Sequence, residues 1–293
     1  MIDLHQHLWP PPFLSALRAR RRPPRLEGWT LELFEGDRWA IDPGGHEPAT
    51  RPRGEQLIAL APSAALGIDR LAPAEAAELA EVWLAGVLAL GGPYAPWATA
   101  GTITPDPVVL TAALGRGAIG LEVAADALAA PDGLDRLAPL LQALDDRPLL
   151  VHPGPTAGQE ALRPPWWTPT VDYTAQLNAA WWAWTDRGRA RFPRLPVCFA
   201  ALAGLGPLHA ERQRARGGVD APVDSLSFVE TSSYGTRAVD AVLRVLGVDV
   251  ICHGTDRPYG EPAALELDSA ARHAITDANP ARLLARSILE VPT

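Results

Sequence analysis

The sequence contains no lysine. All 26 of its basic side chains are arginines. This excludes a lysine Schiff base and a metal bridge made from a carboxylated lysine, because both need the lysine amine. The net charge of −8 argues against a nucleic-acid-binding protein, since such proteins carry a basic excess.

Cysteine and long apolar segments are also scarce. The two cysteines, Cys198 and Cys252, provide no disulfide framework, so we expect a reduced, cytoplasmic setting. The first residues lack the basic region and apolar stretch of a signal peptide. Proline, glycine or charged residues interrupt every apolar run before it reaches the length of a membrane span. We therefore expect neither a membrane nor a nucleic-acid partner.

What the sequence does contain is an alternation of short apolar segments and helical stripes. The apolar segments show little internal alternation, which is typical of strands buried on both faces. The predicted strands are 56–61, 97–103, 117–123, 148–152, 196–201, 226–230 and 248–253, and the predicted helices are 74–90, 107–114, 134–144, 172–189, 208–216, 236–246, 262–271 and 279–289. Together with a strand at the N-terminus, this order predicts a single-domain α/β protein, a (β/α)8 TIM-type barrel spanning residues 1–293.

A long irregular segment, residues 9–53, follows the first strand. It contains an amphipathic piece with Phe13, Leu14 and Leu17, and a run of alternating apolar residues from Trp29 that predicts a short hairpin. A loop this long inside a compact domain is usually functional. We therefore expect it to be an insertion that covers the substrate.

Histidines and one aspartate fall at the ends of predicted strands. Side chains two residues apart in a strand point to the same face, so His5 and His7 project together, with Asp3 below them. His152 ends the fifth strand and Asp256 follows the eighth. The carboxyl ends of barrel strands meet at one end of the barrel, so these side chains are expected to converge. Three imidazoles and a carboxylate suit one divalent ion, zinc first, with manganese, iron or cobalt as alternatives.

Six stretches of the sequence together resemble a known family. In chain order they are IDLHQHLWPP at 2–11, LLVHPGP at 149–155, RFPRLPVCFAALAG at 191–204, FVETSSYG at 228–235, ICHGTDRPYGEP at 251–262 and NPARLL at 279–284. They resemble the amidohydrolase superfamily in its amidohydrolase-related branch, which includes the aminocarboxymuconate-semialdehyde-type decarboxylases. The resemblance implies a barrel with a mononuclear metal held by His5, His7, His152 and Asp256. It further implies that Asp256 is the acid/base.

One position departs from the family pattern. The family has a histidine at the end of the sixth strand, where this sequence has Ala201. Alanine cannot orient water, polarise a carbonyl or bind a metal. Three explanations remain open: His209 or His253 has taken over the catalytic role, the reaction does not need that histidine, or the barrel binds a ligand without turnover.

Several other residues are candidates for the site, most of them with two alternative roles. Glu122, on the fourth strand, is either a bridge to a second metal or an ion-pair partner inside the barrel. Trp166 and Trp167 either form an apolar wall for a flat substrate or pack in a homodimer interface. Thr255 and Arg257 flank Asp256 and are candidates for fixing its orientation. Glu230, which ends the seventh strand, either orients a ligand or is a structural hydrogen-bond acceptor.

These observations predict an enzyme that acts on a small molecule. The first expectation is a metal-dependent hydrolase of a carboxylate, lactone, amide or ester, in which the metal activates water. The alternative is a metal-dependent, non-oxidative decarboxylase of an aromatic or unsaturated carboxylic acid. A further alternative is a degenerate barrel that binds a ligand without catalysis.

Overall fold

A ring of parallel strands forms the centre of the computed structural model, which describes residues 1–51, 54–156, 163–218, 223–261 and 263–288. The strands of the ring are β1 (Ile2–His7), β5 (Leu57–Ala61), β6 (Tyr94–Pro96), β7 (Leu121–Ala124), β8 (Leu149–His152), β9 (Val197–Phe199), β10 (Ser227–Glu230) and β11 (Ile251–Cys252). β1, β5 and β6 form one sheet, and β7 to β11 form another in consecutive order. Parallel bridges at Gln6–Arg257 and Ala98–Leu121 join the two sheets at both seams. The predicted (β/α)8 barrel is therefore confirmed.

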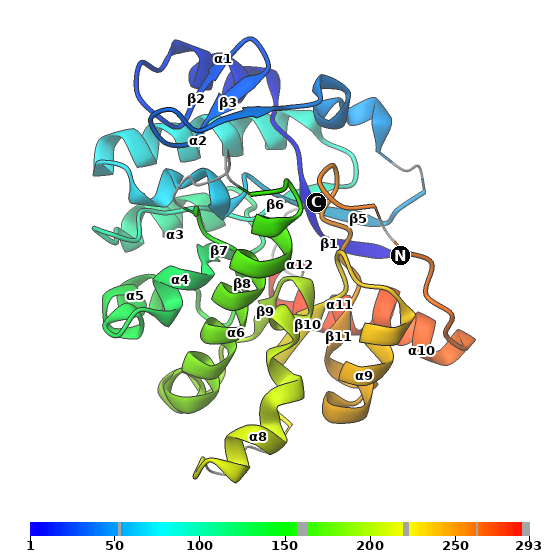
Figure 1. The fold of residues 1–293 in the computed structure, drawn as a ribbon. Helices are drawn as coiled ribbons and strands as arrows, with labels where there is room; N and C mark the ends of the chain where they lie inside the picture. The colour runs from blue at the N-terminus through cyan, green and yellow to red at the C-terminus, as the bar shows by residue number, and fades with distance from the viewer. Residues whose placement is uncertain (52–53, 157–162, 219–222, 262, 289–293) are drawn as a thin grey trace.

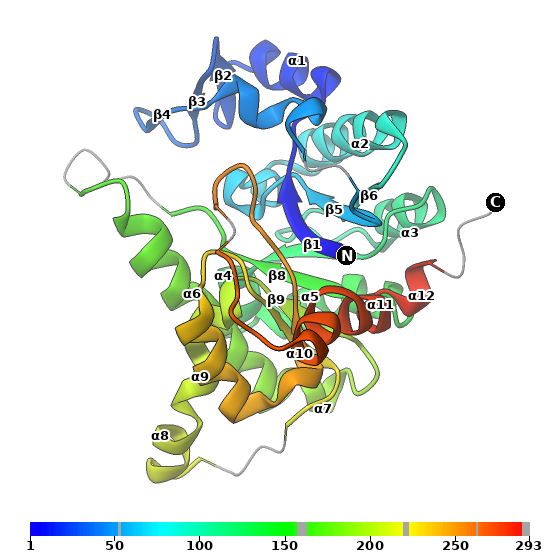
Figure 2. The same cartoon turned by 90° about the vertical axis from the view of Figure 1, so that its right-hand side faces the viewer.

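Helices surround the strands (Figure 1, Figure 2). The α-helices are α1 (Pro11–Ala19), α2 (Pro73–Leu90), α3 (Pro107–Gly115), α4 (Ala125–Ala129), α5 (Gly133–Ala143), α6 (Tyr173–Ala183), α7 (Arg189–Arg191), α8 (Ala210–Ala215), α9 (Thr236–Leu246), α10 (Ser269–His273), α11 (Asn279–Leu283) and α12 (Ala285–Ile288). Short 3₁₀ segments are η1 (Pro43–His46), η2 (Pro48–Thr50), η3 (Ala64–Leu66), η4 (Ile68–Arg70), η8 (Ala201–His209) and η9 (Val248–Val250), and π-helical turns are η6 (Thr168–Asp172), η7 (Trp184–Gly188) and η10 (Ala274–Ala278). Among the helices described, none is both long and apolar enough to cross a bilayer.

The barrel strands are buried on both faces, as their apolar sequences predict. Every residue of β7, β8, β9 and β10 is buried. Two tryptophans in this core keep their polar atoms bonded: Trp97 Nε1 donates to Leu4 O over 3.0 Å, and Trp83 Nε1 donates to Leu8 O over 3.0 Å. The close packing requires glycine at Gly120, where a Cβ would lie 2.1 Å from the Pro148 carbonyl oxygen.

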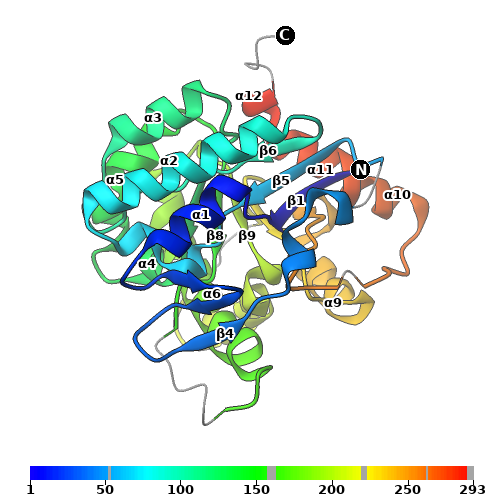
Figure 3. The same ribbon diagram turned by 90° about the horizontal axis from the view of Figure 1, so that it is seen from above.

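The segment after β1 forms a small subdomain at the end of the barrel toward which β1 runs (Figure 2, Figure 3). It consists of α1, η1, η2 and an antiparallel sheet of β2 (Arg25–Glu27), β3 (Thr30–Glu32) and β4 (Arg38–Ala40) in the order β2-β3-β4. The expected hairpin is thus present, with one further strand. Buried apolar residues of α1, β2 and β3 join the main core. Arg51 Nη2 ties this subdomain to the barrel, because it donates to both His7 O (2.5 Å) and Gly45 O (2.7 Å).

Three predicted elements differ from the structure. The strand predicted at 97–103 is wrong: pairing ends at Ala98, whose N–H donates to Gly120 O, and the chain then leaves the ring. The strand predicted at 248–253 is a 3₁₀ turn followed by the two-residue strand β11. The helix predicted at 262–271 is also wrong, since residues 263–268 are not helical and α10 begins only where Asp268 caps the N–H of Ala271. Residue 262 lies outside the described residues, as does residue 289 at the end of the last predicted helix.

Candidate metal centre

Four side chains converge at the carboxyl end of the barrel. His5 and His7 project from β1, His152 is the last residue of β8, and Asp256 lies in the loop after β11. One ligand atom from each lies within 4.8 Å of all the others. The three imidazole rings meet edge to face, with centroids 4.8 to 5.0 Å apart. The structure therefore brings together the four residues that the sequence predicts as metal ligands.

The hydrogen bonds of the histidines fix which ring nitrogen is free. In each ring, Nδ1 faces an oxygen that can only accept, so Nδ1 carries a proton and Nε2 is left to bind either a metal ion or a second proton. The acceptors are Glu230 Oε1 at 3.1 Å for His5, Ala61 O at 3.0 Å for His7 and Pro153 O at 2.8 Å for His152. The Nε2 atoms of His5 and His7 are only 3.0 Å apart. Two lone pairs this close repel each other unless a proton or a metal ion lies between them, so the donor set can hold a metal ion in place of the proton.

The electrostatics of the cluster agree with this. Burial lowers the pKa of His5, but the hydrogen bond and charge of Glu230 outweigh burial and raise that pKa to about 9. Burial lowers the pKa values of His7 and His152. Burial raises the pKa of Asp256, but the hydrogen bond to His7 and the neighbouring imidazoles bring it below its usual value. The cluster thus holds a proton where a metal ion would bind, and the two compete.

Backbone and side-chain bonds hold β1 against the loop that carries Asp256. Asp3 Oδ1 accepts from the N–H of His5 (3.1 Å) and of Thr255 (3.2 Å), and Asp3 Oδ2 accepts from Thr255 Oγ1 over 2.7 Å. The N–H of Asp256 donates to His5 O over 2.8 Å. Thr255 therefore fixes this loop through Asp3. Arg257 takes part through its backbone, since its carbonyl accepts from the N–H of His7 over 2.6 Å.

Glu230 links the metal cluster to the position where the family histidine is missing. Its side chain is fully buried. Besides facing His5, Oε1 accepts from the N–H of Ala201 (2.7 Å) and from Ser232 Oγ (2.6 Å), and Oε2 accepts from the N–H of Ser232 (2.6 Å). A Cβ at Gly254 would lie 2.2 Å from Glu230 Oε2, so glycine leaves room for this carboxylate. Glu230 is thus a structural acceptor that also orients a predicted ligand.

The segment 201–205 at the end of β9 forms an unusual turn. All five of its residues have positive φ, from 45° at Ala201 to 62° at Leu205. Left-handed helical backbone costs an L-residue roughly 1–2 kcal/mol. The N–H of Ala201, bonded to Glu230, fixes the first residue, and the turn brings Ala201 to the wall of the pocket described next.

A pocket of about 700 Å³ opens above the four ligands. Its walls combine apolar side chains of the insertion, three tyrosines and several other hydroxyl groups. The main lining residues are Leu31, Leu33, Trp39, Ile41, Ser63, Thr168, Thr170, Tyr173, Thr174, Ala201, Ser232, Ser233, Tyr234, Tyr259 and Glu261. Sequence reasoning missed this hydroxyl-rich wall. The available signal was that three of the four tyrosines follow barrel strands or the loop after the fifth.

The structure places Trp166 and Trp167 differently from the expected substrate wall. Neither is among the pocket residues, although their neighbours Pro165 and Thr168 are. Trp166 is 57% exposed, and the Arg163 guanidinium lies 5.0 Å from the Trp167 ring centroid. The tryptophan that lines the pocket is instead Trp39, from the insertion.

Glu122 is buried beside the cluster but is not part of it. Its Oε1 accepts from the N–H of Ala64 over 3.1 Å and lies 3.9 Å from His152 Nδ1. Burial raises the pKa of Glu122 to about 8, so at neutral pH this side chain is mostly an uncharged carboxylic acid. Glu122 does not belong to the group of described side chains that could hold a metal, so the structure does not support a bridge to a second metal.

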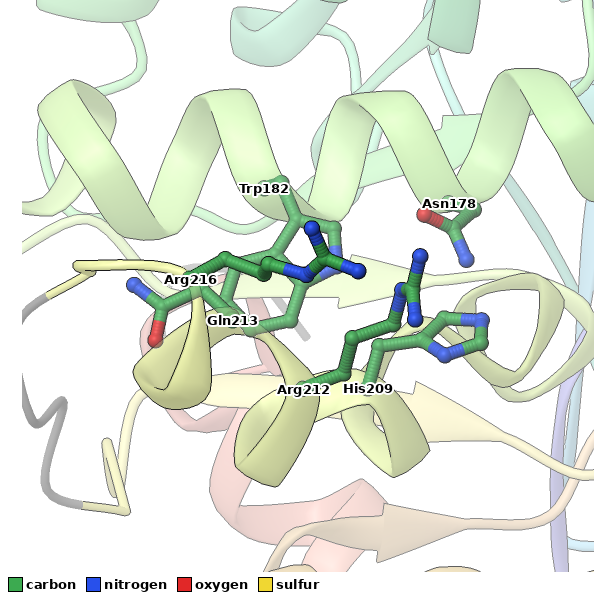
Figure 4. A pocket seen from close by; sticks show the side chains of 6 residues that line it. All are labelled: Asn178, Trp182, His209, Arg212, Gln213 and Arg216. Carbon is green, nitrogen blue, oxygen red and sulfur yellow. The ribbon is translucent and has the colours of Figure 1, made fainter.

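The two histidines considered as substitutes for the missing one lie elsewhere. His209 lines a separate groove of about 340 Å³ between α6 and α8, with Asn178, Trp182, Arg212, Gln213 and Arg216 (Figure 4). His253 is half-buried; its N–H donates to Ile275 O and its carbonyl accepts from the N–H of Leu4. Neither belongs to the set of described residues that line the metal pocket.

Comparisons with known proteins were informative at the level of structure. No family model and no curated protein sequence matches the chain. Among solved structures, the 5-carboxyvanillate decarboxylase of Sphingomonas paucimobilis is 16% identical, with a TM-score of 0.74 over 97% of this chain and 98% of that one. The 2,6-dihydroxybenzoate decarboxylase from Rhizobium is 17% identical, with a TM-score of 0.70 over 97% and 98%. A dihydroxybenzoic acid decarboxylase from Polaromonas, with bound manganese and 2-nitroresorcinol, is 16% identical, with a TM-score of 0.67 over 97% and 96%.

These neighbours contradict the first functional expectation. Each is named as a decarboxylase of an aromatic acid and none of the three as a hydrolase, so the expectation of hydrolysis is corrected in favour of its alternative. The neighbours agree with the sequence resemblance to the amidohydrolase superfamily. The chain therefore shares its (β/α)8 barrel fold with these decarboxylases.

Proposed function

We propose that the protein is a metal-dependent, non-oxidative decarboxylase of an aromatic or unsaturated carboxylic acid. The observation that carries the proposal is the convergence of three Nε2 lone pairs and the Asp256 carboxylate beneath a pocket with apolar and aromatic walls. The activities of the structural neighbours support it. We further infer that the insertion, which lines this pocket, covers the bound substrate.

His5, His7, His152 and Asp256 would hold one divalent metal. Manganese is our first choice because a neighbour binds it, and zinc, which also suits imidazole and carboxylate ligands, is the alternative. When bound, the metal would supply positive charge that attracts the substrate carboxylate and stabilises negative charge developing on the substrate. Glu230 and the backbone carbonyls bonded to the other two rings keep the histidines in the required tautomer.

Asp256 is proposed as the proton donor. Decarboxylation breaks the bond between the ring carbon and the carboxylate, releases carbon dioxide, and needs one proton on that ring carbon. The surroundings of Asp256 lower its pKa, so it is a carboxylate at neutral pH and must first take a proton from water in the pocket. It then donates that proton to the ring carbon and returns to carboxylate. The side chain is 23% exposed and lines the pocket, which gives it access to the substrate.

The pocket walls serve the reaction in two ways. Leu31, Leu33, Trp39 and Ile41 present apolar surface that orients a flat ring and keeps water away from it. Exclusion of water favours departure of uncharged carbon dioxide over retention of a charged carboxylate. Ala201 contributes no catalytic side chain, so the proposal assigns the only proton transfer to Asp256.

The test is carbon dioxide release by protein loaded with Mn²⁺ or with Zn²⁺. A panel of hydroxybenzoic acids should release carbon dioxide in equal amount to the decarboxylated phenol. Asp256→Asn should lower kcat by about 10²–10⁴-fold, the usual contribution of a positioned acid, with metal content measured in parallel to separate lost chemistry from lost metal. Release that is undetectable across the panel, with metal and ligand both bound, would contradict decarboxylation and favour the non-catalytic barrel.

A further inference from the structure

The charges around the pocket are unevenly distributed. None of the described residues that line it is an arginine, and the sequence has no lysine. The charged groups it does contain are acidic: Asp256 at the base and Glu261 in the segment after β11. A metal bound by the cluster would therefore be the only positive charge that these lining residues offer a ligand.

Two arginines near the site in sequence, Arg51 and Arg163, are engaged in other contacts. Arg51 donates to the carbonyls of His7 and Gly45. Arg163 pairs with Asp172 at 3.3 Å and stacks on Trp167. In these contacts the two guanidinium groups hold parts of the protein together.

Hydroxyl groups supply the polar surface of the pocket. Tyr173, Tyr234 and Tyr259 line it together with serines and threonines of η6, α6 and the loop after β10. Burial raises the pKa of Tyr234, so its hydroxyl remains an uncharged donor. Such groups can bond to hydroxyl or ether oxygens of a ligand, but they do not neutralise a charge.

We propose that the pocket selects monocarboxylic acids whose ring bears only uncharged polar substituents, and that it rejects dicarboxylic acids. This inference rests on the proposed function and narrows its substrate class. It separates this chain from the neighbour named for 5-carboxyvanillate, a substrate with two carboxylates. The physical reason is that a second carboxylate would lose its water without gaining a cation, beside the negative charge of Glu261.

Three matched ligands test the proposal by binding to the Mn²⁺-loaded protein, measured by isothermal titration calorimetry. They are 2-hydroxybenzoate, 4-hydroxyisophthalate, which adds a second carboxylate, and the methyl ester of that second carboxylate, which has a similar size without the charge. The ester should bind at least about tenfold more tightly than the dicarboxylate at low salt, and the difference should shrink as ionic strength rises. Equal or tighter binding of the dicarboxylate overturns the proposal, and so does a failure of all three ligands to bind.

Two pocket substitutions and one control locate the selectivity. Glu261→Gln should tighten dicarboxylate binding severalfold and leave ester binding unchanged. Glu266→Gln removes the same charge from a residue outside the pocket lining, so it should change neither. Leu33→Arg places a guanidinium in the apolar wall and should strengthen dicarboxylate binding by at least about tenfold, as expected for a charge-assisted bond. Unchanged ratios in both pocket variants would overturn the assignment.

The outcomes also separate this proposal from the proposed function. Selective binding of the ester without carbon dioxide release leaves the charge selectivity intact and contradicts decarboxylation. Carbon dioxide release from the dicarboxylate at the rate of the ester leaves decarboxylation intact and overturns the selectivity.

Discussion

At the scale of single residues, the metal ligands could be predicted from the sequence, but the residue that orients one of them could not. Strand parity and the rule that barrel chemistry lies at the carboxyl ends of strands are enough to group His5, His7, His152 and Asp256. The role of Glu230 depends on how β9 and β10 are aligned, because the same carboxylate bonds to His5 and to the N–H of Ala201. No local pattern encodes that alignment. A buried acid at a strand end indicates only that some partner exists.

Glu230→Gln is expected to weaken Mn²⁺ binding by about 10–100-fold, the usual effect of losing a residue that orients a metal ligand. The amide oxygen can still accept, but its NH₂ group would face the N–H of Ser232, so the side chain would shift away from His5. Mn²⁺ titration followed by electron paramagnetic resonance measures the change. Asp240→Asn, on the exposed face of α9, is the matched control. If both variants bind Mn²⁺ as tightly as the unaltered protein, Glu230 does not position His5.

At the scale of elements, helical periodicity predicted the ends of helices more closely than composition predicted the ends of strands. The predicted helices at 74–90, 107–114 and 236–246 agree with α2, α3 and α9 to within one residue at each end. The predicted strands at 97–103 and 248–253 are too long, because a short apolar run does not reveal where inter-strand pairing stops. Composition also did not identify which tryptophans reach the pocket. Trp39 does so because β3 and β4 lie over the barrel mouth (Figure 3).

The left-handed turn at 201–205 gives a prediction about stability. Gly204 and Gly28 have nearly equal φ, 58° and 61°. A Cβ at Gly204 would lie 2.3 Å from Thr174 O, whereas a Cβ at Gly28 would have no atom of the described residues beyond its chain neighbours within 4 Å. Gly28→Ala should therefore cost only the conformational penalty of about 1 kcal/mol. Gly204→Ala should cost at least about 2 kcal/mol more, because backbone must move.

Urea unfolding of the two glycine variants measures these costs as changes in the free energy of unfolding. Gly204→Ala should also weaken ligand binding, since α6, which carries the clashing carbonyl, lines the pocket through Tyr173 and Thr174. Equal losses of stability in the two variants would show that the turn adjusts freely and is not held against α6.

At the scale of the whole molecule, the insertion and the barrel share one core, and His46 lies where they meet. Its ring stacks on Trp9 with centroids 4.2 Å apart and is 4% exposed. Neither ring nitrogen has a hydrogen-bond partner within the part of the chain that the structure describes. Burial, reinforced by the charge of Arg51, lowers the pKa of His46 to about 3. In the folded protein this histidine is therefore an uncharged aromatic group that holds the insertion over the metal site.

Because His46 is buried uncharged, the free energy of unfolding should decrease as the pH falls into the acid range. The unfolded chain protonates His46 near pH 6.5 and the folded chain only near pH 3. Between these values the unfolded state binds more protons, so stability is complete above pH 6.5 and falls as the pH decreases toward 3. From pH 7 to pH 4 the loss from this residue should be about 3 kcal/mol.

His46→Phe keeps the stack without the titration, so the free energy of unfolding should fall less over that range. Urea unfolding at pH 4 and pH 7, with a chelator to remove metal linkage, measures the difference. His209→Phe alters an exposed histidine in a separate groove and should leave the pH dependence unchanged. Parallel pH profiles for His46→Phe and the unaltered protein would mean that His46 can be protonated in the folded state, and that the contact between insertion and barrel opens to water as the pH falls.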